Sequence, residues 1–411
     1  MVVMSTVLVE PTENVRWPWT LRYNTAWVGV MVGFYGPIQV LLPNQAEAIA
    51  AESKETVLAW VFGIGAAFST VFNPLWGALS DRTLSRFGRR LPWIAVGGLA
   101  GAASLVLLSA ADTVAELVIG WCLVQTALNA PWAALTAVVP DQVPRRQRGA
   151  AAGYLGLAQM LGVVIATGLA GVLPGAAGYL ACAVVLLVSL VPFLLQRRDP
   201  PLPPEQRPPW DLRAFLRGFW VSPRRYPDFG WAWLTRFLLN LSNGLLLAYL
   251  LYYLRDELGI ADAEGALLVL TVVNVLGVMA AVLIAGVWSD RLARRKVFVI
   301  VSGLIMAAAA FLLAGVATYP VAIIAAAVVG IGFGVYTSVD FALITQVLPA
   351  AADRGKDLGV LNISNTLPQV VAPALAAPLV TQLGGYPALF AASGLVAVLG
   401  AVLVGRITSV A

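Results

Sequence analysis

Twelve apolar segments follow one another along the 411-residue chain. Each is close to the roughly 20 residues that a helix needs to span the ~30 Å hydrocarbon core of a bilayer, where a helix satisfies its own backbone hydrogen bonds. Only 11% of the residues are charged and 60% are hydrophobic, which leaves too little charge for the surface of a soluble globular protein. The sequence therefore predicts an all-α membrane protein with twelve transmembrane helices.

The predicted helices form two groups of six, separated by the proline-rich stretch RRDPPLPPEQRPP, which cannot be helical. We expect an N-terminal six-helix bundle over residues 1–196, a cytoplasmic linker over 197–228 and a C-terminal six-helix bundle over 229–411. The predicted spans are Ala26–Leu42, Val57–Leu79, Leu91–Ala110, Val114–Val139, Ala150–Val172 and Gly178–Leu195, then Gly230–Leu254, Ala266–Trp288, Val297–Ala317, Val321–Leu348, Leu358–Leu383 and Pro387–Leu403.

Within the linker, five apolar residues share one helical face opposite two arginines, a pattern typical of a short amphipathic helix on the inner leaflet. The apolar residues are Leu212, Phe215, Leu216, Phe219 and Trp220, and the arginines are Arg213 and Arg217. A solvated loop is the alternative for this segment.

Basic residues predict the orientation of the helices. Of the 26 lysines and arginines, all but Lys54, Arg255 and Arg236 lie in the termini, the linker and alternate loops. The positive-inside rule then places both termini in the cytoplasm, and leaves Lys54 and Arg255 on the outer side. The same distribution explains the sequence pI of 9.4 without a nucleic-acid partner.

The two halves contain an internal repeat. GALSDRTLSRFGRR and GVWSDRLARRK place Asp81 and Asp290 in matching positions 209 residues apart, and Pro140 and Pro349 match at the same offset. Parallel repeats of six helices imply two pseudo-symmetric bundles, with a binding site for a small molecule near the bilayer midplane. We expect such bundles to give access to the two sides of the membrane in turn.

Several kinds of chemistry are excluded or unsupported by the residues. The chain has no histidine, so an imidazole proton relay or a histidine-ligated metal is impossible. Cys122 and Cys182 fall in predicted spans without a CxxC motif, so we interpret them as packing residues. No nucleophile–base motif or phosphate loop is present, and we therefore predict no enzyme activity, no metal and no cofactor.

Polar residues inside the predicted spans recur at helical spacing, which indicates stripes that face the bundle interior. Amides and aromatic rings suit a neutral polyol, although interhelical hydrogen bonding is an equal alternative for any single amide. The predicted substrate-binding residues are Tyr35, Gln39, Asn73, Gln125, Asn129, Trp132, Gln159, Asn240, Asn243, Tyr336, Asn362 and Asn365, with Trp132 as the leading stacking residue.

Asp340 is the one acidic residue deep inside a predicted span, and Arg236 is its basic counterpart at a similar predicted depth. Because an unpaired charge in a bundle is costly, we predict that the two interact directly or through water. Asp340 could carry a coupling proton, or the pair could be a static brace.

The loop NPLWGALSDRTLSRFGRRLPWI and the segment NAPWAALTAVVPD resemble those of the major facilitator superfamily, in particular the glycoside-pentoside-hexuronide cation symporters and the proton-coupled sucrose transporters. The resemblance implies the major facilitator fold and transport of a sugar or glycoside. In melibiose-permease-like members, carboxylates bind the coupling cation at positions matching Ser69, Asn73 and Asn129. All three residues are uncharged here, which favours a proton over sodium and also allows uniport.

The same resemblance implies a cytoplasmic gate at Gly77, Asp81, Arg82, Arg89 and Arg90, with Asp290 and Arg291 as its second copy. Gly77 is expected to allow close approach of a neighbouring helix, and Asp81 to require arginine partners because it follows a helix carboxyl end. The alternative is that the arginines only determine topology.

Together these features predict a proton-coupled sugar symporter that works by alternating access as a monomer in a bacterial inner membrane. An exporter of a drug or secondary metabolite is the second hypothesis. A sensor or lipid scramblase is a third, but it would not require paired gates.

Overall fold

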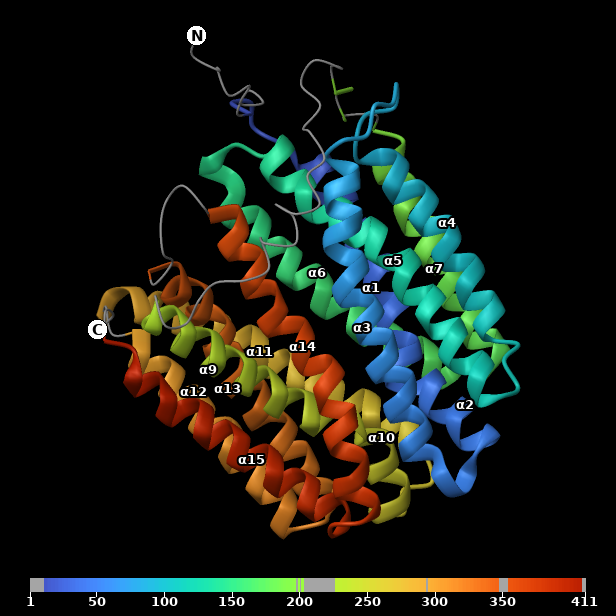
Figure 1. Cartoon of the computed structure of the whole chain (residues 1–411), viewed down its shortest axis with the longest axis vertical. Helices are drawn as coiled ribbons and strands as arrows, with labels where there is room; N and C mark the ends of the chain where they lie inside the picture. The colour runs from blue at the N-terminus through green and yellow to red at the C-terminus, as the bar shows by residue number, and fades with distance from the viewer. Residues whose placement is uncertain are drawn as a thin grey trace. The chain divides into compact units, whose positions relative to one another are not determined.

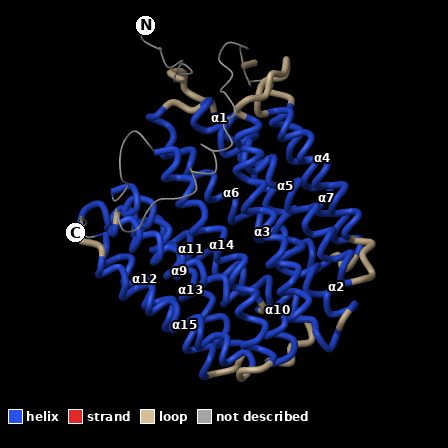
Figure 2. Tube along the Cα trace, viewed as in Figure 1, coloured by secondary structure: helices blue, strands red, loops and turns tan. Residues whose placement is uncertain are grey.

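The computed structural model describes residues 11–196, 199, 201–202, 226–292, 295–346 and 354–408. Within these ranges the chain is helical, with connecting loops and no strand (Figure 2). Twelve helices of the described chain are long and apolar enough to cross a membrane, which confirms the predicted fold class. The expected amphipathic helix of the linker lies outside the described residues.

Contacts divide the chain into two compact units. Unit 1 comprises residues 1–45 and 68–210, and unit 2 comprises residues 46–67 and 211–411. The helices of the first half are α1 (Trp17–Gly36), the π-helix η1 (Pro37–Leu41), α2 (Leu42–Ile49), the 3₁₀ turn η2 (Ala51–Ser53), α3 (Lys54–Ser80), α4 (Leu91–Leu108), α5 (Val114–Gln142), α6 (Arg145–Val172) and α7 (Ala176–Leu194).

The second half begins with α9 (Pro227–Ala248), α10 (Leu250–Tyr252) and the π-helix η4 (Tyr253–Glu257). It continues with α11 (Ala263–Leu292), α12 (Arg295–Gly315), α13 (Tyr319–Gln346), α14 (Arg354–Thr381), α15 (Gly385–Leu403) and the 3₁₀ turn η5 (Val404–Arg406). Several helices extend beyond the apolar segments that predicted them. α3, for example, starts at Lys54 and runs for 27 residues.

The two halves repeat the same pattern of helix packing. In unit 1, α1 packs against α6 and α7, and α4 packs against α5 and α7 (Figure 1). In unit 2, α9 packs against α14 and α15, and α12 packs against α13 and α15. Because these pairs correspond one to one along the chain, the packing supports the repeat read from the sequence.

Small residues allow close contact between α11 and α13 in unit 2. A Cβ atom at Gly330 would lie 2.3 Å from the carbonyl oxygen of Asn274, and one at Gly334 would lie 2.6 Å from that of Val278. Both glycines are therefore required for this backbone approach, as in other small-residue helix interfaces in membranes.

Candidate functional site

Asn129 is the centre of a hydrogen-bonded amide cluster in unit 1, between α3 and α5. Its side-chain oxygen accepts a hydrogen bond of 2.9 Å from the amide of Asn73, and its amide donates to Ser69 Oγ at 3.0 Å. The same amide donates to the backbone oxygen of Gln125 at 2.7 Å. Asn129 is only 3% exposed, so these partners replace water and fix the orientation of the side chain.

These three positions, Ser69, Asn73 and Asn129, are the ones that the family resemblance associates with cation-binding carboxylates. The structure brings them together, but as neutral groups that satisfy one another. The cluster therefore offers oxygen atoms without the negative charge that a sodium site requires.

Trp132 lies on α5 within an aromatic group of unit 1. Its ring meets Trp27 edge to face, with 5.1 Å between centroids, and Phe34 in the same manner at 5.6 Å. Trp132 is half-buried, whereas Trp27 is 1% exposed. Trp27 and Phe34 thus hold Trp132 in place while part of its ring stays accessible.

In unit 2, Arg236 on α9 and Asp340 on α13 form an ion pair through Arg236 Nη1 and Asp340 Oδ2. The side chains are 14% and 9% exposed, so most of the pair is shielded from solvent. Arg236 Nε also donates to Asn365 Oδ1 at 2.9 Å. The predicted direct interaction between the two charges is thus present within this unit.

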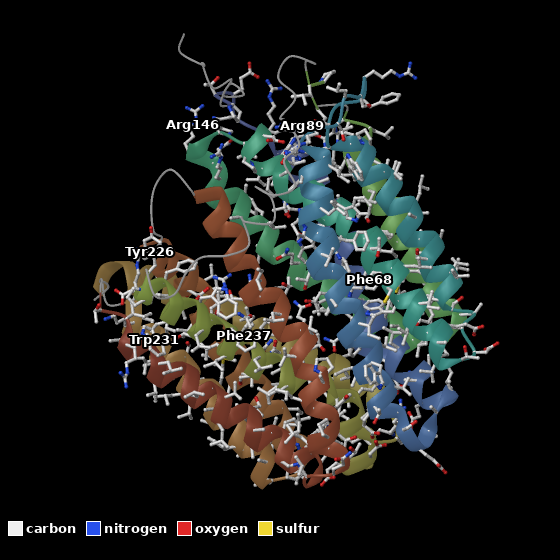
Figure 3. The ribbon with its side chains drawn as sticks, viewed as in Figure 1. Phe68, Arg89, Arg146, Tyr226, Trp231 and Phe237 are labelled. Atoms are coloured by element: carbon white, nitrogen blue, oxygen red, sulfur yellow. The ribbon has the colours of Figure 1, made fainter. Side chains whose placement is uncertain are left out.

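Asn240 extends the polar group around this ion pair. Its amide donates to the hydroxyl of Tyr336 at 3.2 Å and to Asn365 Oδ1 at 3.3 Å. Asn365 thereby receives hydrogen bonds from both Arg236 and Asn240, which are one turn apart on α9. Figure 3 shows Phe237, the neighbour of Arg236, part-way along this helix. The predicted pair of Arg236 and Asp340 therefore forms one connected polar group with Asn240, Tyr336 and Asn365.

Arg90 organises a second set of charges in unit 1, at the end where α3 leads into α4. Its guanidinium bonds to Asp81, to Asp141 at 2.9 Å and to Ser80, and the residue is only 4% exposed. Arg89 pairs with the other oxygen of Asp141 at 2.6 Å, and Figure 3 shows Arg89 at this end of the unit. Asp81 therefore has the arginine partner that its place after a helix carboxyl end requires.

Gly77 and Arg82, two further predicted gate residues, lie at and just after the end of α3. A Cβ atom at Gly77 would meet the nearest side chain, that of Ala133, at 4.0 Å, which is ordinary contact. The expected close approach at Gly77 is therefore wrong, because the neighbouring helix leaves room for a methyl group. Arg82 donates to the backbone oxygen of Ala78 at 2.7 Å, within the end of its own helix.

Two carboxylates without a recognisable sequence signal complete this cluster. Asp141, the last residue of the segment NAPWAALTAVVPD, pairs with both arginines. Asp199, which follows the first bundle, accepts hydrogen bonds from the backbone N–H groups of Arg90 and of Leu91, the latter at 2.8 Å, and so caps α4. Burial raises the pKa of the Asp199 carboxyl, while these N–H groups oppose the rise.

The structure leaves several predicted site residues apart from these clusters. Tyr35, Gln39, Gln159 and Asn243 are half-buried on their helices. The side chains of Asp290, Arg291 and Asn362 lie outside the described part of the chain. Cys122 and Cys182 are free and buried, as expected of packing residues.

Known proteins are similar to this chain in sequence or in architecture. The family model described as Major Facilitator Superfamily matches residues 27–279 and 232–409. A multidrug resistance protein, MdtG of Serratia proteamaculans, is 25% identical over 316 residues, covering 71% of this chain and 72% of that protein.

Two solved transporters share the fold along almost their whole length. The human organic anion transporter MFSD10 superposes with a TM-score of 0.68 at 18% identity, covering 94% of this chain and 99% of that one. The nucleoside transporter NupG, in a mutant form, superposes with a TM-score of 0.74 at 12% identity, covering 95% and 99%. The two family matches together span both halves, so this multi-pass membrane protein, a transporter of small molecules and not an enzyme, belongs to the Major Facilitator Superfamily.

Proposed function

We propose that this chain is a proton-coupled symporter that moves a sugar or glycoside by alternating access. The observation that carries the proposal is the connected polar group of Arg236, Asn240, Tyr336, Asp340 and Asn365 in unit 2. It combines one carboxylate able to take up a proton with amide and phenol groups that can exchange their hydrogen bonds for those of solute hydroxyls.

The unit 1 residues supply complementary chemistry for the same solute. Trp132 presents part of an aromatic ring, to which the C–H face of a sugar packs, and the amides around Asn129 can donate and accept. The other predicted substrate-binding residues, Tyr35, Gln39, Gln159, Asn243 and Asn362, are also proposed to contact the solute. The resemblance of the loop after α3 to glycoside–cation symporters and sucrose transporters supports this solute class.

A proton fits the coupling role better than sodium does. The amide cluster at Ser69, Asn73 and Asn129 is uncharged and internally satisfied, whereas Asp340 is a buried carboxylate within α13. In this proposal, Asp340 binds the proton when solute or a conformational change weakens its pairing with Arg236. One chain, working as a monomer in a bacterial inner membrane with both termini in the cytoplasm, is sufficient for this cycle.

Export of a drug or secondary metabolite is the second candidate, because a relative of similar length is named a multidrug resistance protein. The aromatic group of Trp27, Phe34 and Trp132 would suit a more apolar solute. In that case proton movement would oppose solute movement, and the two candidates therefore predict opposite responses to a pH gradient.

The test is transport by purified protein in liposomes, with the outside more acidic, with equal pH, and with a sodium gradient. A panel of labelled mono- and disaccharides is compared with a panel of fluorescent drug-like amines. The proposal predicts that at least one saccharide accumulates only with the proton gradient, up to about tenfold per pH unit for one-to-one coupling with the membrane potential held at zero. Proton-driven efflux of the amines without saccharide uptake would overturn it.

A further inference from the structure

Five charged side chains form a connected network in unit 2, where α3 begins. Glu47 accepts a hydrogen bond from Lys54 at 3.0 Å and pairs through its other oxygen with Arg255. Lys54 also pairs with Asp256 at 2.7 Å, and Arg255 with Glu264 at 2.6 Å. The network therefore joins the α2–α3 segment to η4 and to the start of α11.

Lys54 is the most enclosed member of this network. It is 8% exposed, and its ammonium lies 4.6 Å from the centre of the Tyr252 ring. Its partner Asp256 also accepts a hydrogen bond of 3.1 Å from the Tyr386 hydroxyl. An ammonium buried to this extent depends on its two carboxylate partners, because removing either one takes away one of its two ion pairs.

The two carboxylates that bind Lys54 are related by the internal repeat. Glu47 and Asp256 stand 209 residues apart, as do Asp81 and Asp290, so they occupy equivalent positions in the two halves. The cations are not repeated, because an alanine occupies the position equivalent to Lys54, and another the position equivalent to Arg255. Lys54 thus binds both members of a repeat-related carboxylate pair.

Part of the network lies on a segment of the first half of the chain that groups with unit 2. Residues 46–67 group with unit 2, whereas residues 68–80 of the same continuous helix α3 group with unit 1. Lys54 and Arg255 are also the two basic residues that the loop charges assign to the outer side. Lys54, the first residue of α3, is therefore both part of the network and on the outer side.

We propose that Lys54 and Arg255 form a releasable clasp that fastens residues 46–67 to unit 2 while the outer side of the transporter is closed. Alternating access requires such a contact to separate when the outer side opens. Ion pairs suit this role, since entering water hydrates the separated charges, as it would not do for an apolar contact. The inference concerns the conformational cycle and holds for any solute.

The experiment measures the distance between spin labels at Ser53 and Glu257, two exposed positions on either side of the clasp, by pulsed electron resonance. Cys122 and Cys182 are first replaced by alanine so that only the two introduced cysteines react. Lys54→Met removes the charge, Lys54→Arg retains it, and Glu52→Gln changes an exposed neighbouring charge as the matched control.

The clasp predicts that Lys54→Met increases the fraction of molecules at the longer distance at least threefold, while Lys54→Arg and Glu52→Gln keep the parental distribution. Asp256→Asn, which removes one of the two acceptors of Lys54, should shift the distance distribution in the same direction by a smaller amount. If Lys54→Met does not fold, the result for Asp256→Asn tests the proposal in its place. An unchanged distribution in folded Lys54→Met or in Asp256→Asn, or an equal shift in Lys54→Arg, would overturn the proposal.

Discussion

The ion pair between Arg236 and Asp340 permits a quantitative prediction about stability. Asp340→Asn would leave the guanidinium of Arg236 in a site where the side chain is only 14% exposed. Arg236→Met would leave the carboxylate instead, although a carboxylate can reduce its cost by taking up a proton. The double variant Arg236→Met/Asp340→Leu removes both charges and keeps apolar side chains of comparable volume.

The magnitudes follow from the burial of the pair. At an ion-pair separation of about 3 Å and an effective dielectric constant of about 20, the attraction is on the order of 5 kcal/mol before desolvation is subtracted. Breaking a buried pair by removing one partner costs about 3 to 5 kcal/mol. Because Asn365 still contacts Arg236 in the aspartate variant, we expect the lower end, about 3 kcal/mol. The double variant should lie within about 1 kcal/mol of the parent.

The assay is the free energy of unfolding in mixed micelles, measured for the parent, both single variants and the double variant. The prediction is strong non-additivity, with the double variant more stable than Asp340→Asn by about 2 kcal/mol. Additive losses in the double variant, or a loss below about 0.5 kcal/mol in Asp340→Asn, would show that the two charges do not depend on each other.

Three further changes follow from the unit 1 clusters, each measured as the free energy of unfolding. Asn129→Leu should cost about 1 to 3 kcal/mol, because it leaves the half-buried amide of Asn73 without its acceptor; a neutral result would contradict this. Asp141→Asn, which loses bonds to two arginines, should cost about 1.5 to 3 kcal/mol, against less than about 1 kcal/mol for Asp81→Asn, whose side chain is 48% exposed. The reverse order would contradict the assigned geometry. Gly88→Ala should cost at least about 2 kcal/mol, since φ is +97° there and a Cβ atom would lie 2.2 Å from the carboxylate that caps α4; tolerance of alanine would mean that this cap is not formed.

Much of the fold could be predicted from the sequence because the bilayer imposes simple constraints on helix length and polarity. Twelve helices, the repeat and the pairing of Arg236 with Asp340 follow from span length, offset and the cost of a buried charge. Helix ends were less predictable, since segments such as residues 54–56 are polar and continue a helix beyond its apolar part.

The site residues that could not be predicted from the sequence were hidden for one physical reason. Asp199 and Asp141 act through tertiary contacts with Arg89 and Arg90, and periodicity within one helix carries no information about which loops meet. Close approach at Gly77 was inferred from residue type alone, but the space beside a glycine depends on its neighbour. The network at Lys54 was equally hidden, although its repeat-related carboxylates could have been found by applying the 209-residue offset to the outer loops.

The most direct test of the account is proton movement during transport by the Asp340→Asn variant. In lightly buffered liposomes, addition of the transported solute should make the medium more alkaline for the parent protein, because a proton enters with each solute molecule. Asp340→Asn should abolish this pH change and the accumulation driven by a pH gradient, while exchange of labelled for unlabelled solute continues. Proton-driven accumulation that persists in the variant would contradict the account.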